Sequence, residues 1–333
     1  MAFTIKVVSK SSSNKHQTLP HKGHDKPSQQ ASGGTTPIPF IDRLTVTLTV
    51  PTKEVGKDMW QAYWTAVQDE GAMKKASCSK GYSRGHRLHL PSVLDSKKWP
   101  HYQVAWQDKC ITRARLDFVP VDLGYDGMVE LDAALTGLMD CGWAYLVVHG
   151  RITRLDVAMD FPDASMNDFH FLPTQGATSS SWSQSGKLQT YQHGKSRGNC
   201  TSVYDRGAKR KAQGKGWQGK VGVRVERRLR NPKVDLHGLP SMANPFADMN
   251  MVKRVIEPPQ SDTKQPYIWS LFMDAADTIG LPAALARLPV KKRTAYRKHL
   301  AKHLQPWWDA EVSWAGWATM LAELKIANAN AWY

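Results

Sequence analysis

Short segments in which hydrophobic and polar residues alternate recur between residues 40 and 230. An alternation with a period of two is typical of a β-strand that has one buried face. Segments with helical spacing lie between them, around residues 57–68 and 126–142. This order predicts a mainly antiparallel sheet with packed helices. Its main strands are expected in FIDRLTVTLTV (40–50), CITRARLDFV (110–119), ITRLDVAMDF (152–161), CTSVYD (200–205) and VGVRVERRL (221–229).

From about Pro232 the pattern changes to apolar residues at helical spacing, so the C-terminal region is expected to be mostly helical. The predicted fold class is therefore α+β, with three parts. They are a disordered basic tail (1–38), a core domain (39–231) and a helical region (232–333). Helices are expected in SMANPFADMNMVKRVI (241–256), YIWSLFMDAADTIG (267–280), LPAALARL (281–288) and VKKRTAYRKHLAKHL (290–304), followed by a Trp-rich end.

The charge of the chain indicates an anionic partner. Lys and Arg total 45 against 29 Asp and Glu, a formal net charge of +16. No apolar run approaches the roughly 18 residues of a membrane-spanning helix. The first ten residues lack the apolar core of a signal peptide. We therefore expect a cytoplasmic protein with no membrane partner. The cysteines are too scattered for a zinc ribbon or a disulfide framework: Cys78, Cys110, Cys141 and Cys200.

Three predicted strands share a face on which an acid lies among arginines, in Arg-Leu-Asp at 115–117 and 154–156 and Arg-Val-Glu at 224–226. One interpretation is that each acid pairs with neighbouring arginines on a solvated face. The other is that the three carboxylates converge on Mg²⁺ or Mn²⁺, and that the arginines bind a phosphodiester. A second carboxylate, Asp160, shares a strand face with Asp156. Because two residues span ~7 Å of strand, we expect Asp160 to cap the strand end or to hold an arginine instead.

The segment that begins at Tyr204 is strongly basic. From Tyr204 to Arg230 there are ten Lys or Arg and two acids, a net charge of +8. A tyrosine at a strand end is commonly a packing residue. Its hydroxyl is also a poor nucleophile until cations or a general base stabilise the phenolate. The surrounding cations would supply that stabilisation and would offset charge on an attacked phosphate.

Four segments occur in the order and approximate spacing of a known family: RLDF (115–118), ITRLDVAMDF (152–161), SVYDRGAKRK (202–211) and VRVERRLR (223–230). Residues 110–230 resemble the replication initiation factor (Rep_trans) family, the rolling-circle initiators of small bacterial plasmids and filamentous phages. The resemblance implies Tyr204 as the nicking nucleophile and Asp117, Asp156 and Glu226 as metal ligands. Position 117 departs from the family pattern, which usually has Glu there, and Arg206 stands where Lys is common.

The resemblance implies a magnesium- or manganese-dependent enzyme that binds replication-origin DNA, supercoiled or single-stranded at the nick site. Nicking would leave a 5′-phosphotyrosyl link and a free 3′-OH primer. Host helicase and polymerase are expected partners, and a homodimer is a further expectation. The alternatives are a non-catalytic, sequence-specific DNA-binding replication or regulatory protein, and an RNA-binding or packaging protein.

The predicted phosphate-binding residues lie in two regions. The first comprises the basic residues of the four motif segments, and the second is the predicted helix 290–304, where a solvated helix face is the alternative. On that helix Ala295, Leu300 and Leu304 are expected to form the apolar stripe. The tryptophans at 307, 308, 314, 317 and 332 are expected to lie in the core or a dimer interface. The full set is Arg115, Arg154, Arg206, Lys209, Arg210, Lys211, Arg224, Arg228, Lys291, Lys298 and Lys302.

Overall fold

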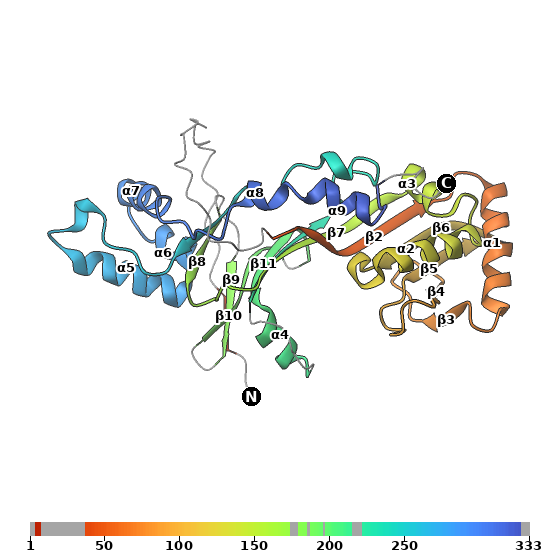
Figure 1. Ribbon diagram of the computed structural model, residues 1–333, viewed down its shortest axis with the longest axis horizontal. Coiled ribbons are helices and arrows are strands. Elements are labelled where there is room, and N and C mark those ends of the chain that lie inside the picture. The colour runs from red at the N-terminus through yellow and green to blue at the C-terminus, as the bar shows by residue number, and fades with distance from the viewer. Residues whose placement is uncertain are drawn as a thin grey trace. The chain divides into compact units, whose positions relative to one another are not determined.

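The computed structural model describes residues 4–7, 37–173, 179–184, 187–195, 197–214 and 222–327 (Figure 1). Its strands pair antiparallel and helices follow in the C-terminal region, so the α+β prediction is confirmed. Contacts divide the chain into two compact units, each built from separate segments. Unit 1 comprises residues 1–37, 160–225 and 245–313, and unit 2 comprises 38–159, 226–244 and 314–333.

Unit 2 contains a sheet with the strand order β12-β7-β2-β6-β5-β4-β3. Most of β7 belongs to it, together with the last residues of β12. Leu44 on β2 lies opposite Phe118 on β6 and Leu155 on β7, and all three side chains are buried. The strands are β2 (Phe40–Thr49), β3 (Met73–Ala76), β4 (Arg84–Leu88), β5 (His101–Gln107), β6 (Cys110–Phe118), β7 (Arg151–Phe161) and β12 (Val223–Arg230).

The helices of unit 2 are α1 (Lys53–Gln68), α2 (Pro120–Thr136), α3 (Gly142–His149) and α9 (Trp317–Glu323), with the 3₁₀ turn η1 (Leu239–Ser241). Thr52 caps the N-terminus of α1, because its hydroxyl accepts a hydrogen bond from the Val55 amide at 3.3 Å. The helix lies directly on β6. A Cβ added at Gly56 would come within 2.5 Å of Cys110 Sγ. Only a residue without a side chain allows this approach.

Unit 1 contains the strand order β1-β9-β10-β11-β12, with the first residues of β12. Its strands are β1 (Thr4–Val7), β9 (Ser179–Gln184), β10 (Lys187–Gly194) and β11 (Cys200–Asp205), and β11 leads directly into α4 (Arg206–Ala212). Of the predicted disordered tail, the structure describes Thr4–Val7, which pair with β9, and Pro37 and Ile38. The rest of that tail lies outside the described residues.

The C-terminal part of unit 1 is a helical cluster of α5 (Pro266–Ile279), α6 (Leu281–Ala286) and α7 (Val290–Leu300), with the 3₁₀ turn η2 (Gln260–Asp262) before it. Helix α8 (Ala310–Trp314) follows α7. Buried aromatic and aliphatic side chains fill the space between these helices. They include Trp269, Phe272, Leu285, Tyr296 and Leu300.

Two local predictions in this region are wrong. Residues 241–256 do not form a helix, because Met249–Lys253 form strand β13, which pairs with β8 (Phe169–Pro173). On α7 the buried residues are Tyr296 and Leu300, whereas Ala295 and Leu304 are exposed. The large Tyr296 side chain is in the core because its ring packs on Trp269 and Phe272. No helix in the described ranges is long and apolar enough to cross a membrane.

Candidate functional site

Tyr204 lies near the end of β11 in unit 1, and its side chain is only 4% exposed. Immediately after β11, the Asp205 carboxylate accepts a hydrogen bond from the Ala208 amide at 2.8 Å and caps α4. The first turn of this helix brings Lys209 back toward the strand. Its Nζ lies 3.7 Å from the centroid of the Tyr204 ring, which is a cation–π contact. The strand-to-helix turn therefore places a cation on the phenol.

Asp160 holds two arginines in the same unit. Arg224 donates from Nε to Oδ1 at 2.6 Å and from Nη2 to Oδ2 at 2.9 Å. Arg206 donates from Nη1 to Oδ2 at 2.5 Å. Burial lowers the pKa of Arg206, and the charge of Arg224 lowers it further, while Asp160 and Tyr204 oppose the shift. Asp160 therefore has the arginine-holding role that was one of its two sequence interpretations.

Asp117, on β6 of unit 2, is 7% exposed and bound by two arginines. Arg43 on β2 forms a two-point contact, with Nε to Oδ1 and Nη2 to Oδ2 both at 2.7 Å. Arg115 contributes a contact to Oδ2 at 3.2 Å. Burial alone would raise the pKa of Asp117, but the hydrogen bond and charge of Arg43 outweigh it, and the pKa is lowered. This carboxylate is therefore ionised and paired.

Asp156 and Glu226 are also paired with arginines in unit 2. Asp156 is 1% exposed and accepts from Arg154 Nε at 2.9 Å to Oδ1, with a closer contact from Arg154 Nη2 to Oδ2. Arg228 Nε lies 3.4 Å from Asp156 Oδ2, and its Nη2 lies 3.5 Å from Glu226 Oε1. One arginine thus joins the acids of β7 and β12.

The three predicted metal ligands thus lie among arginines on the sheet of unit 2, and we call this set the acid–arginine face. It comprises Asp117, Asp156 and Glu226 with Arg43, Arg115, Arg154 and Arg228. Within the described residues, no group of three His, Cys, Asp or Glu side chains could hold a metal ion. Each of the three acids instead contacts an arginine, and their role as metal ligands stays a prediction. The acid–arginine pairing considered from the sequence is present, but it is buried rather than solvated.

Sequence reasoning missed Arg43, which is the main partner of Asp117. Strand β2 was predicted correctly, but its polar face was not connected with the acids of β6 and β7. Arg43 lies opposite Asp156 in the ladder between β2 and β7, two residues before Thr45, which lies opposite Asp117. Residues two apart share a face of a strand. The alternation in FIDRLTVTLTV therefore contained the signal that Arg43 faces these acids.

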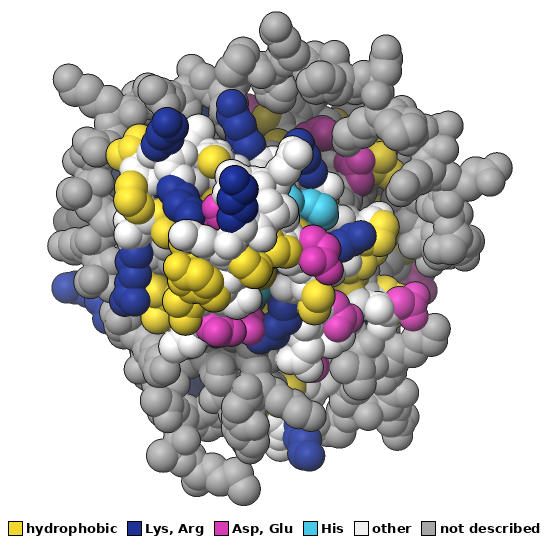
Figure 2. All heavy atoms as spheres, turned by 90° about the vertical axis from the view of Figure 1, so that its left-hand side faces the viewer, with side chains coloured by type: hydrophobic (Ala, Val, Ile, Leu, Met, Phe, Trp, Pro, Cys, Tyr) yellow, Lys and Arg dark blue, Asp and Glu magenta, His cyan; other side chains and the backbone are white. Residues whose placement is uncertain are grey.

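The other predicted phosphate-binding residues are cations at or near the surface. On α4, Lys209 and Lys211 are exposed and Arg210 is half-buried. Lys291 and Lys298 are exposed on α7, and Lys302 is exposed just beyond its end. Figure 2 faces the helical cluster with α5 and α7, where Lys and Arg side chains are interspersed with hydrophobic and acidic ones. On the described part of this face, basic residues do not form one continuous patch.

The C-terminal tryptophans have mixed environments. Trp308 in unit 1 and Trp317 in unit 2 are buried, and their indole N–H groups donate to Met249 O at 3.0 Å and to Leu239 O at 2.7 Å. This confirms a core position for both. Trp307 and Trp314 are half-buried, and Trp332 lies outside the described residues.

No family model and no curated protein matches this chain. Among solved structures it is similar to a rolling circle replication initiator protein from Geobacillus stearothermophilus. The sequence identity is 14% and the TM-score is 0.38, over 74% of this chain and 98% of that chain.

Proposed function

We propose that this chain is a rolling-circle replication initiator that binds and nicks origin DNA through Tyr204. The observation that supports this most strongly is the environment of that tyrosine. Lys209 lies over its ring, and Arg206 follows it by two residues and bonds to Asp160 beside Arg224. These are the charges that a phenolate and an attacked phosphate require. The proposal also rests on the order of the four sequence motifs.

In the proposed reaction, the Tyr204 oxygen attacks a phosphorus of the origin strand. A Tyr–O–P bond forms, and the bond between phosphorus and the 3′ oxygen breaks. The phenol loses its proton, and the departing 3′ oxygen gains one and becomes the primer hydroxyl. Lys209 favours the phenolate through its charge. Arg206 and Arg224, both oriented by Asp160, provide donors for the phosphate oxygens.

A nicking assay on supercoiled origin DNA tests the role of Tyr204. Wild-type protein is expected to relax the plasmid and to leave a covalent protein–DNA adduct after denaturation. Tyr204→Phe removes the hydroxyl but keeps the ring under Lys209, so nicking and adduct should fall to background while DNA binding persists. Tyr191→Phe is the matched control, because Tyr191 is also buried and lies on the adjacent strand β10. Adduct formation by Tyr204→Phe at the wild-type level would contradict the assignment.

Metal dependence is a separate expectation, and no step above is routed through a metal ion. To bind Mg²⁺ or Mn²⁺, Asp117, Asp156 or Glu226 would have to exchange an arginine contact for the ion. We expect EDTA to stop nicking and either ion to restore it. Activity that is unchanged in EDTA would instead assign the acid–arginine face to holding the sheet together. Origin-DNA binding measured in the same buffers separates a loss of chemistry from a loss of binding.

A non-catalytic DNA-binding protein is the second candidate. It is favoured by the pairing of all three acids with arginines and by the low exposure of Tyr204. Such a protein would bind the origin specifically and form no adduct with any divalent ion. The adduct assay therefore distinguishes the two candidates. Recruitment of helicase and polymerase, homodimerisation and a cytoplasmic location belong to the proposal in either case.

A further inference from the structure

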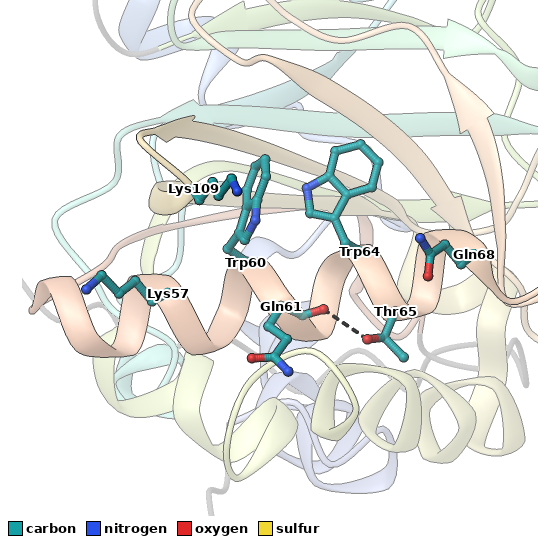
Figure 3. Close-up of a pocket in the computed structure, with 7 residues that line it drawn as sticks. All are labelled: Lys57, Trp60, Gln61, Trp64, Thr65, Gln68 and Lys109. Atoms are coloured by element: carbon teal, nitrogen blue, oxygen red, sulfur yellow. Dashed lines mark hydrogen bonds between the residues drawn. The ribbon is translucent and has the colours of Figure 1, made fainter.

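Helix α1 of unit 2 carries an aromatic hollow that the nicking proposal does not use. Trp60 and Trp64 rise from one side of the helix, one turn apart (Figure 3). Trp106 of β5 packs against both rings. The ring centroids of Trp60 and Trp106 are 4.8 Å apart. All three tryptophans are half-buried, so part of each indole remains at the surface. The hollow along this side of α1 has a volume of about 530 Å³.

The polar rim of the hollow is basic. Lys57 precedes Trp60 by one turn of α1, and Lys109 lies beside Trp60, while Gln61 and Gln68 complete the lining (Figure 3). No carboxylate is among the described residues that line it. Asp58 of α1 and Asp69, which follows the helix, line a separate hollow together with Gly137. The lysines of the rim therefore suit an anionic ligand, and the tryptophan rings suit flat apolar groups on that ligand.

The polar atom of Trp64 indicates that these rings are more than packing residues. Its indole nitrogen is buried and has no hydrogen-bond partner among the described residues. A buried donor without an acceptor is unfavourable, and a purely apolar side chain at this position would avoid that cost. Tyr63, the inward neighbour, shows the contrasting case, because its hydroxyl is paired with His86 Nδ1 at 2.9 Å. Packing in the core alone therefore does not account for a tryptophan at position 64, and we infer that its indole contacts a ligand.

We propose that this hollow binds single-stranded DNA, with bases stacked on Trp60 and Trp64 and phosphates held by Lys57 and Lys109. Base faces are accessible for stacking in a single strand, whereas in a duplex they already stack on one another. Tryptophan rings combined with lysines are the general means by which proteins hold unpaired strands. The choice of DNA rests on the proposed function, since nicking and unwinding release a single strand at the origin.

The binding test uses the full chain and a fluorescein-labelled oligo(dT), followed by fluorescence anisotropy. Trp60→Ala and Trp64→Ala are each expected to weaken binding by roughly 5- to 100-fold, the effect of losing one stacked base. Trp60→Phe keeps an aromatic face and should retain most of the affinity. Binding of a duplex of equal length should not change. Tyr267→Ala, which removes an aromatic side chain that is 59% exposed on α5, is the matched control and should bind oligo(dT) as wild type does.

The lysines are tested through the salt dependence of binding. Lys57→Gln and Lys109→Gln should each reduce the slope of log K against log salt by about 0.7, the value for one phosphate contact on a single strand. Lys53→Gln, on the same helix but outside the hollow, should leave the slope unchanged. Equal slopes for all three variants would overturn the proposal.

A cross-linking experiment avoids any mutation that could unfold α1. Wild-type protein is irradiated with an oligonucleotide that contains 5-bromodeoxyuridine, and the attachment sites are mapped by peptide sequencing. Attachment at Trp60 or Trp64 supports the inference, and attachment confined to other peptides overturns it. It is also overturned if Trp60→Ala weakens self-association in sedimentation, or binding of an acidic peptide, but leaves oligo(dT) binding intact. Tyr204→Phe should bind oligo(dT) normally, so a failure of nicking and a failure of this site are distinguishable.

Discussion

Arg43 and Asp117 show how a buried acid remains charged in this protein. Two short hydrogen bonds and a second arginine compensate for the removal of the carboxylate from water. The sequence indicated which strand face carries the acids, because alternation assigns faces directly. It could not indicate whether an arginine or a metal ion would meet each carboxylate. That choice depends on strand register, which places Arg43 opposite Asp156 and in reach of Asp117.

The tryptophans of the hollow were missed for a related reason. Trp60 and Trp64 are four residues apart on α1, a spacing that equally suits a core face. Their partial exposure depends on how α1 lies on β6. The glycine that permits this approach, Gly56, is an inconspicuous residue in the sequence. Residue types alone therefore could not separate packing from a binding surface.

His170 makes the stability of unit 1 sensitive to pH. It is 1% exposed, and its Nε2 lies 3.5 Å from Asp277 Oδ1, which Arg254 holds at 2.8 Å. Neither imidazole nitrogen has a hydrogen-bond partner in the described structure. Burial lowers the pKa of His170 to about 4, Asp277 opposes this shift, and Arg254 adds to it. The imidazole is therefore neutral in the folded protein at neutral pH.

The predicted consequence follows from linkage between protonation and folding. Above pH ~6.5 the imidazole is neutral in both states and contributes nothing. Between about 6.5 and about 4 the unfolded chain binds a proton that the folded one does not, so stability falls as pH falls. By pH 5 the loss should reach ~2 kcal/mol. Urea unfolding at pH 7 and pH 5 measures it.

His170→Gln should remove this part of the pH dependence. His149→Gln, which replaces an exposed histidine on α3, is the control and should retain it. If wild type and His170→Gln lose equal stability between pH 7 and pH 5, the buried histidine is not the source.

At the scale of elements, alternation was a reliable guide wherever a strand has one apolar and one polar face. Strands β2, β6, β7, β11 and β12 were all expected near their observed bounds. Strand β13 was not, because Met242, Phe246, Met249 and Val252 follow helical spacing through this segment and the strand itself is short. Its strand structure comes from pairing with β8, a partner that is distant in sequence. On α7 the mistake was to choose Ala295 instead of the neighbouring Tyr296 as the inward residue.

Gly56→Ala is expected to loosen α1 from β6. Alanine favours a helix by ~1 kcal/mol over glycine, but the new Cβ would lie 2.5 Å from both Cys110 Sγ and Ile111 O. Since the carbonyl is backbone, relief requires the helix to move. We expect a net loss of ~1–3 kcal/mol in the free energy of unfolding.

Gly137→Ala is the matched control, because its nearest contact would be an ordinary 3.5 Å from Ala134 O. It should change stability by no more than ~0.5 kcal/mol. Chemical denaturation followed by circular dichroism compares the two. A Gly56→Ala protein as stable as wild type would mean that α1 is not held at this close approach.

At the scale of the whole molecule, composition predicted a basic protein, and the hydrophobic pattern predicted a sheet-rich first part and a helical last part. It did not predict how the chain is shared between compact units. Each unit combines three separate segments, and two of the five passages between the units occur inside strands, within β7 after Met159 and within β12 after Val225. Hydrophobic patterns report local periodicity and contain no information on which distant segments meet. The sequence pattern predicted a core domain (39–231) and a helical region (232–333), each formed by one continuous segment. That division into domains stays a prediction.

Unit 2 is built from segments far apart in the sequence, and this affects when it can fold during synthesis. Strand β2 leaves the ribosome long before residues 317–326, on which two buried tryptophan contacts of unit 2 depend. Trp143 Nε1 donates to Ile326 O at 3.0 Å, and Trp317 Nε1 donates to Leu239 O at 2.7 Å. Synthesis of the whole intervening chain separates Trp143 from its acceptor. This part of unit 2 therefore cannot be complete before Ile326 has been synthesised.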